Sequence, residues 1–431
     1  MIDAISIGRS ESQQIRVVVL QHVEEAAHLH RIRTVHAHAA HVRLLHLGRF
    51  DVRLAAHLDG IAVAGEYGTR LALQALEQPD AGTLFVVTVR AIEDRDLERL
   101  DTVIELGRIL PEARAGLVSA LGWVRSATLQ GITKSMLMSS HPWQCELGLE
   151  TCAMHAVDPG RALDAALRDP SPGLRVSALR VAGRCGRRDL AATCLAELDD
   201  GDERYAFEAA RAALLLGDRA ESLRFLEALT FKQDLNANLR IWATRLVLKV
   251  VGPTAAQSIL AALAKDAAPI RDVIKGIAVA GDPHYVSWLI AQMEDLKLAR
   301  LAGEAFALIT GLDLAYLDLE RKPPEGVEFG PNDDPADDNV ALDEDEGLPW
   351  PDPDKIAGWW KTNGARFRPG TRFFMGEVPT PAQCLHVLKS GFQRQRIVAA
   401  EYLTLLVPGT VLFNTAAPAW RQQRLLMSMQ A

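Results

Sequence analysis

The amino-acid sequence predicts an all-α protein, and more specifically an α-solenoid of helical hairpins. Of its 431 residues, 48% are hydrophobic and 24% are charged, which is typical of a folded globular chain and excludes a disordered or collagen-like one. Aromatic residues make up only 6%, while alanine and leucine dominate, and this balance favours closely packed helices over β-sheets. An internal repeat indicates that these helices are arranged in hairpins.

The repeat is marked by glycines that end apolar segments. They are Gly186, Gly217, Gly252, Gly281 and Gly311, separated by 31, 35, 29 and 30 residues. The positions 1, 4, 5 and 8 residues before each glycine share one helical face and are apolar or small nearly throughout. Glycine suits the left-handed residue that ends a helix. A second apolar stretch follows the first four glycines, at residues 190–198, 223–229, 259–263 and 286–293. The sequence therefore predicts helix-turn-helix repeats of about 30 residues, as in an α-solenoid.

The remaining elements extend this repeat in both directions. Weaker hairpins are expected at residues 71–76 with 84–92 and at 103–110 with 117–124, where Pro111 is expected to start a helix, and another helix at 141–156. Residues 14–57 predict one or two helices of different character, and C-terminal helices are expected at 381–389, 393–406 and 420–427. The predicted parts are a histidine-rich helical cap at 1–60, the solenoid at 61–320, an acidic proline-rich loop at 321–354 and a basic helical capping segment at 355–431.

The net charge of -8 is distributed unevenly along the chain. Ten acidic and no basic residues lie between Asp333 and Asp354, and the chain without them would carry a net charge of +2. From Lys355 to the end there are ten bases and two acids. Residues 321–353 also contain seven prolines, so this acidic segment is predicted to be a loop or linker rather than a helix.

The acidic segment has two main interpretations. It can be a solvated linker, or a docking surface for a basic partner with nearby tryptophans as hydrophobic anchors. A calcium loop is not predicted, because the required oxygen-ligand spacing and the terminal glutamate are lacking. The tryptophans have an equally good alternative role in packing the C-terminal segment onto the solenoid. The residues predicted to contact a partner are Asp333, Asp334, Asp337, Asp338, Asp343, Glu344, Asp345, Glu346, Trp350, Trp359 and Trp360.

The basic C-terminal segment has two interpretations of its own. Its basic residues are Arg366, Arg368, Arg372, Lys389, Arg394, Arg396, Arg421 and Arg424, apart from Lys355 and Lys361 near its start. They could bind nucleic acid, or they could neutralise the acidic loop of the same chain. The second interpretation is favoured, because an acidic neighbour repels phosphate.

Metal binding has two candidate clusters in the sequence. His141, Cys145, Cys152 and His155 have pairwise spacings that resemble those of zinc ligands, but Cys145 and Cys152 would be about 10 Å apart along a helix, too far for one ion. Eight of the twelve histidines precede residue 58, and the closest group is His36, His38 and His41. No acid or cysteine accompanies that group, so a helix surface is the preferred explanation. We predict no metal site.

No catalytic motif supports an enzyme. Phosphate-binding loops, dinucleotide fingerprints, zinc-protease helices and nucleophile elbows are all missing from the sequence, so neither an activity nor a cofactor is predicted. The five cysteines are an odd number without C-x-x-C spacing, which suits a reducing compartment. Without a signal-like start or a long apolar run, the sequence predicts a cytoplasmic protein that does not bind a membrane.

Several stretches resemble a known family. The repeats, most clearly DPSPGLRVSAL at 169–179, resemble short HEAT repeats of the phycobilisome-lyase type over residues 65–319. More of the chain resembles a proteobacterial family of HEAT-repeat proteins, through AAHLDGIAVAG at 55–65, RFRPGTRFFMG at 366–376, RQRIVAA at 394–400 and FNTAAPAWRQQR at 413–424. Members of this family occur beside type VI secretion spike genes, and at least one is the immunity protein of a GHH-type nuclease toxin.

The resemblance implies an immunity protein that binds and neutralises a cognate nuclease toxin, without direct nucleic-acid binding. In such a protein the acidic segment could occupy the toxin's cationic DNA groove by charge mimicry. One alternative is a scaffold or adaptor that loads an effector onto the secretion spike. Others are a HEAT-repeat DNA glycosylase, which would need a basic concave face, and a bilin lyase, which repeat type alone suggests.

Overall fold

The structure is a computed structural model that describes residues 15–199, 201–265, 269–327, 330 and 342–429. These residues form 22 α-helices and a few short 3₁₀ turns, and none of them belongs to a β-strand. The prediction of an all-α protein is confirmed. No helix among the described residues is long and apolar enough to cross a membrane.

The chain divides into two compact units. Unit 1 contains residues 15–35 and Leu47–Lys134, and unit 2 contains His36–His46 and residues 135–429. Helix α2 (Leu44–Val63) continues through residue 60, where the sequence analysis placed the end of the N-terminal cap. Helix α7 (Ile132–Leu137) begins in unit 1 and ends in unit 2.

Unit 1 is centred on a nearly buried helix. That helix is α4 (Ala81–Glu93), and the others are α1 (Arg16–His36), α2, α3 (Gly65–Gln74), α5 (Leu97–Ile109) and α6 (Arg114–Trp123). The central helix, α4, is apolar around most of its circumference and packs against α3, α5 and α6. It begins at Asp80, whose carboxylate accepts the backbone N–H of Thr83 at 2.7 Å, while the Thr83 hydroxyl accepts the backbone N–H of Asp80.

One helix start differs from the prediction. Pro111 was expected to begin a helix, but α5 ends at Ile109 and α6 begins only at Arg114. The intervening residues form a turn in which the backbone N–H of Ala113 donates to Leu110 O at 3.1 Å. Proline fits this turn as well as the first residue of a helix, because its fixed φ suits both.

A buried histidine in unit 1 predicts acid sensitivity. The His30 ring is 4% exposed and stacks on Phe85 with 4.1 Å between ring centroids. Burial, and then the charge of Arg33, lower the pKa of His30 to about 4; Asp80 opposes this shift and Arg31 adds to it. The unfolded chain therefore binds this proton more readily than the folded chain does. The free energy of unfolding is expected to fall by about 3 kcal/mol as the pH decreases from about 6.5 to about 4.

Urea unfolding of wild type and a His30→Phe variant across this pH range checks the prediction. The variant should lose most of this pH dependence, since phenylalanine retains the stacking but has no titratable group. His28→Gln is the matched control, because His28 lies on the same helix but is exposed. An identical pH dependence in wild type and His30→Phe would contradict the assignment.

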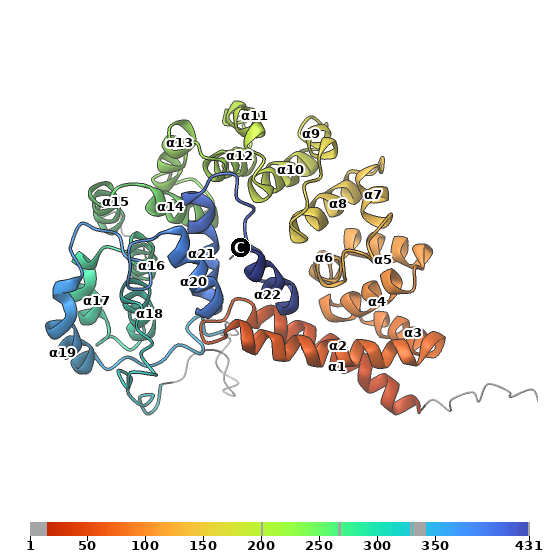
Figure 1. Cartoon of the computed structure of the whole chain (residues 1–431), viewed down its shortest axis with the longest axis horizontal. Helices are drawn as coiled ribbons and strands as arrows, with labels where there is room; N and C mark the ends of the chain where they lie inside the picture. Colours follow the sequence, from red (N-terminus) through yellow and green to blue (C-terminus); the bar gives the residue numbers. More distant parts are fainter. Residues whose placement is uncertain (1–14, 200, 266–268, 328–329, 331–341, 430–431) are drawn as a thin grey trace, which may run out of the picture. The chain divides into compact units, whose positions relative to one another are not determined.

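Unit 2 consists mainly of helices packed in sequence order. They are α8 (Pro142–Met154), α9 (Arg161–Ala166), α10 (Pro172–Cys185), α11 (Ala191–Ala196), α12 (Glu203–Leu216), α13 (Glu221–Thr230), α14 (Ala237–Val250), α15 (Pro253–Lys265), α16 (Ile270–Ala280), α17 (Val286–Gln292) and α18 (Ala299–Thr310). The even-numbered helices pack each against the next, and α11, α13, α15 and α17 pack behind them (Figure 1). After the acidic segment come α19 (Pro353–Asn363), α20 (Pro381–Ser390), α21 (Gln393–Leu406) and α22 (Ala419–Ser428).

Four of the five repeat glycines end helices as predicted. Gly186, Gly217, Gly281 and Gly311 have φ of 69°, 114°, 70° and 75°, the left-handed region that favours glycine. Gly252 is the exception, because α14 already ends at Val250 and Gly252 does not have a positive φ. Pro253 follows it, and a proline restricts the preceding residue to extended conformations. The helical face counted back from the glycines is confirmed as core, since only Cys185 and Ala307 of its positions are not buried.

The C-terminal segment packs along the row of repeat glycines. A Cβ atom on Gly186 would lie 2.3 Å from Gly409 O, and one on Gly281 would lie 2.2 Å from Phe373 O. A Cβ atom on Gly217 would likewise crowd Pro408, and one on Gly311 would crowd the backbone of Met375. Glycine is therefore required at these positions for two reasons: the backbone is left-handed, and a second chain segment approaches closely.

Arg372 binds the carbonyl groups left over at two helix ends. Its guanidinium donates to Leu248 O at 2.7 Å and Val251 O at 2.6 Å at the end of α14, and to Ala280 O at 3.2 Å at the end of α16. The last carbonyls of a helix have no partner within the helix, and a cation there also opposes the negative end of the helix dipole. Arg372 is thus a capping residue for two repeats.

Candidate functional site

A groove of about 830 Å³ lies on the inner side of the even-numbered helices of unit 2. Helices α10, α12, α14, α16 and α18 each contribute side chains to it, while α11, α13, α15 and α17 contribute none. Helix α21 supplies a further wall through Arg394, Ile397, Val398 and Glu401, which recur at helical spacing on one face. Glu344, Asp345 and His38 also line the groove.

The floor of the groove is largely apolar, and its charges are mostly paired. Glu208 accepts hydrogen bonds from Arg180 at 2.9 Å and from Arg211 at 3.2 Å. Burial alone would raise the pKa of Glu208, but the charges of these two arginines outweigh burial and hold it below its usual value. Lys249 pairs with Glu401 in the same manner. Arg180–Glu208 joins α10 to α12, and Lys249–Glu401 joins α14 to α21; both pairs favour the ionised form of their carboxylates.

Another carboxylate of the groove behaves differently. Glu304 on α18 pairs with Arg394 on α21 at 3.1 Å, and its side chain is largely buried. Burial raises the pKa of Glu304 above its usual value, although the Arg394 charge acts in the opposite direction. Desolvation outweighs a single ion pair here.

Two arginines of the groove form no ion pair with any described residue. Arg204 on α12 is exposed, and Arg245 on α14 is half-buried. Trp242 lies one helical turn before Arg245 and is 50% exposed, an unusual fraction for a large aromatic side chain. Its ring centroid is 6.2 Å from that of Phe207. The charge of Arg245 helps to lower the pKa of Glu401, which is already paired with Lys249. This part of the groove therefore combines positive charge in excess of its carboxylates with an accessible aromatic side chain.

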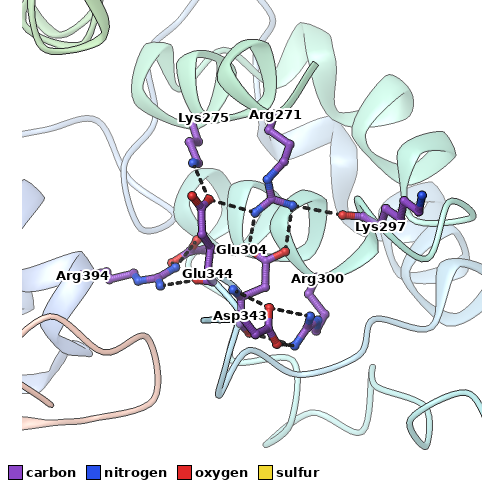
Figure 2. Close-up of polar contacts among 9 residues, drawn as sticks. Arg271, Lys275, Lys297, Arg300, Glu304, Asp343, Glu344 and Arg394 are labelled. Carbon is purple, nitrogen blue, oxygen red and sulfur yellow. Dashed lines mark hydrogen bonds and ion pairs between the residues drawn. The ribbon is translucent and has the colours of Figure 1, made fainter. Parts of the chain in front are cut away.

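The acidic segment is docked on the chain itself. Asp343 pairs with Arg300 at 2.7 Å, and Glu344 pairs with Lys275 at 3.0 Å (Figure 2). Asp345 accepts two hydrogen bonds from Arg271, at 2.6 and 3.0 Å, and its side chain is only 6% exposed. The hydrogen bond that Lys275 donates lowers the pKa of Glu344, and the hydrogen bond that Arg271 donates to Asp345 raises the pKa of Arg271. Asp343, Glu344 and Asp345 are thus held in ion pairs with α16 and α18.

Asp345 provides a test of how firmly this segment is held. An Asp345→Asn substitution is expected to destabilise the docked segment by about 2 kcal/mol, because it removes the charge that neutralises the Arg271 guanidinium. Hydrogen exchange of residues 342–352 should therefore become at least about tenfold faster. Glu346→Gln is the matched control, since Glu346 is exposed and forms no ion pair with a described residue. Equal exchange in both variants would contradict a role of the Arg271–Asp345 pair.

The other predicted partner-binding residues are found in several places. Asp333, Asp334, Asp337 and Asp338 lie outside the described residues. The Trp350 ring lies under Arg300, whose guanidinium carbon is 4.9 Å from the ring centre. Trp359 and Trp360 are half-buried and pack against Phe306, with centroid distances of 6.1 and 6.3 Å. In this structure the tryptophans therefore pack against other parts of the chain, which is the alternative role that the sequence analysis considered for them.

The basic residues of the C-terminal segment have separate roles rather than one shared surface. Arg372 caps helices and Arg396 is completely buried, while Arg366 lies over the rings of Trp359 and Phe367. Arg394 contacts the acidic segment by donating to the backbone carbonyl of Glu344 at 2.8 Å. Asp343, Glu344 and Asp345 are therefore neutralised by α16 and α18, and not by the basic C-terminal segment as the sequence analysis expected.

The metal candidates do not come together. Among the described residues, no group of three or more histidine, cysteine or acidic side chains is placed to hold a metal ion. Cys145 donates to Ser139 O at 3.1 Å, and Cys152 is part of the core. His36 and His41 make an edge-on ring contact at 5.8 Å, whereas His38 lines the groove.

Sequence reasoning missed the groove, although a signal for it was present. The residue six positions before each repeat glycine lines the groove in every repeat, and these residues are Arg180, Arg211, Leu246, Lys275 and Ala305. This position lies beside the core face that was used to find the repeats. The basic character of three of these positions was the available clue.

The fold and the groove define an all-α protein of sequentially packed helices with a charged, partly apolar inner surface. The chain matches no protein-family model, no curated protein and no solved structure.

Proposed function

We propose that this chain is an α-solenoid of HEAT-like hairpins, capped by helical segments at both ends. The proposal is supported by the alternation of inner and outer helices and by the recurrence of left-handed glycines at the ends of α10, α12, α16 and α18. The packing of the C-terminal segment against these glycines supports a role of that segment as part of the same array.

We further propose that the protein is an immunity protein, which binds a nuclease toxin and neutralises it by direct contact. The observation that carries the proposal is the groove, because it presents two arginines that form no ion pair with a described residue, together with the half-exposed Trp242, on a preformed helical surface. Tryptophan and arginine are enriched among residues that dominate protein-binding energies. A rigid inner surface of this kind suits a protein partner.

The acidic segment has a smaller part in this proposal than the sequence suggested. Mimicry of DNA by Asp343, Glu344 and Asp345 would require these residues to leave Arg300, Lys275 and Arg271. Breaking such pairs leaves partly buried charges without partners, which is costly. We therefore assign the main toxin contact to the groove.

The test is co-expression with the product of the neighbouring gene, followed by purification of the complex and a DNA-cleavage assay. A stable complex with suppressed cleavage is the expected result, and an unrelated nuclease that is not inhibited is the control. A stable complex that still cleaves DNA would support the adaptor function instead. Absence of a complex would contradict both functions.

A further inference from the structure

The two parts of the groove differ in whether their positive charges are already used. Near α16 and α18, Lys275 and Arg394 pair with Glu344 and Glu304. On α12 and α14, by contrast, Arg204 and Arg245 form no ion pair with a described residue. All five carboxylates that line the groove already have basic partners. The part of the groove that α12 and α14 form, which we call the open part, therefore has an excess of positive charge.

Apolar surface accompanies this charge. Trp242 stands beside Arg245 on α14, and Leu239 and Leu246 lie within one helical turn of Trp242 on the same helix. Phe207 on α12 is buried beneath this surface, with its ring centroid 6.2 Å from that of Trp242. A ligand that fits the open part must bring negative charge together with at least one apolar side chain.

The chain's own acidic segment is an example of such a ligand. It reaches the groove without helical structure, places Glu344 and Asp345 on basic side chains, and lays Trp350 under an arginine a few residues later. Glu344 and Asp345 line one end of the groove, whereas Trp350 and its arginine, Arg300, are not among the residues that line it. The open part offers a similar combination of groups.

We propose that the open part of the groove binds an acidic segment of the partner protein, which inserts an aromatic or aliphatic side chain against Trp242 while its carboxylates bind Arg204 and Arg245. This inference rests on the proposed function only in taking the toxin as the partner. The binding chemistry itself follows from the charges and the aromatic surface of the groove.

A peptide assay with the full chain tests the chemistry without the toxin. The probe is a fluorescein-labelled peptide with the sequence of residues 342–352, LDEDEGLPWPD, and its neutral control has asparagine and glutamine in place of the acids. Binding is measured by fluorescence anisotropy at low and high salt. The acidic peptide should bind, the neutral one should bind at least about tenfold more weakly, and affinity should fall as salt increases.

Variants locate the binding site. Arg204→Gln combined with Arg245→Gln should weaken peptide binding at least about tenfold and reduce its salt dependence, and Trp242→Ala should weaken it by a similar factor. Arg224→Gln is the matched control, because Arg224 is an exposed arginine on the outer helix α13. An unchanged affinity in the double variant would overturn the inference, as would tighter binding of a single-stranded DNA of equal charge at the same arginines.

The toxin assay separates this inference from the proposed function. If the double variant still binds and inhibits the toxin as wild type does, the groove inference fails and the immunity function stands. If wild type neither captures nor inhibits the toxin but still binds the peptide through Arg204 and Arg245, the immunity function fails and the binding site stands. Circular dichroism and thermal unfolding confirm that each variant is folded.

Discussion

Replacing Arg396 by alanine is expected to destabilise the C-terminal helices by about 4 kcal/mol. Arg396 is completely buried on α21, and burial lowers its pKa to about 10, so it remains protonated at neutral pH. Its guanidinium donates to Leu388 O at 2.7 Å and to the side-chain oxygen of Gln422 at 2.5 Å, and it also bonds to Gln393. It therefore joins α20, α21 and α22.

The large effect is expected because the partners of Arg396 are buried as well. Gln393 and Gln422 are completely inaccessible, and both donate to Thr415 O, at 3.0 and 2.8 Å. Alanine would leave their acceptor oxygens and the Leu388 carbonyl without partners and would open a cavity. A buried network of this kind loses more than one hydrogen bond when its central member is removed.

Urea unfolding and hydrogen exchange of residues 381–428 measure this effect. Arg424→Ala is the matched control, because Arg424 is exposed on α22 and its removal should change stability by no more than about 0.5 kcal/mol. Faster exchange confined to the C-terminal helices would agree with the prediction. A free energy of unfolding equal to that of Arg424→Ala would disprove the central role of Arg396.

The second large effect is expected at Gly281. An alanine there has to adopt a φ of 70°, which costs about 1–2 kcal/mol. Its Cβ atom would also lie 2.2 Å from Phe373 O, so the loop segment around Phe373 has to move. That movement breaks the hydrogen bond from Phe373 N–H to Gly281 O, which is 2.8 Å long. Together these terms predict that Gly281→Ala lowers the free energy of unfolding by about 4 kcal/mol.

Gly65→Ala separates the two causes. Gly65 has a φ of 57°, but a Cβ atom there would meet no atom within 4 Å. Gly65→Ala should therefore lower the free energy of unfolding only by the cost of the left-handed backbone, about 1 kcal/mol. Denaturant unfolding of both variants gives the difference, and exchange of residues 370–376 should increase only in Gly281→Ala. Similar losses in the two variants would show that the contact with Phe373 contributes little.

The sequence by itself determined the helical class, the repeat and most helix ends. These features depend on interactions within a few residues of the chain, such as the apolar face counted back from Gly217 and the left-handed backbone of Gly186. The two errors had the same local origin. Pro253 excludes the expected conformation of Gly252, and Pro111 fits a turn as well as a helix start.

Only the tertiary structure decided which charges are available. Asp345 and Arg271 are far apart in sequence, so nothing in the spacing of the acidic segment indicated that these acids are already paired. The same holds for Arg204, Trp242 and Arg245, whose character depends on the carboxylates that other helices bring near them or fail to bring. Charge and apolar surface become a binding site only when packing brings separate helices together, and the helical period alone does not specify that packing.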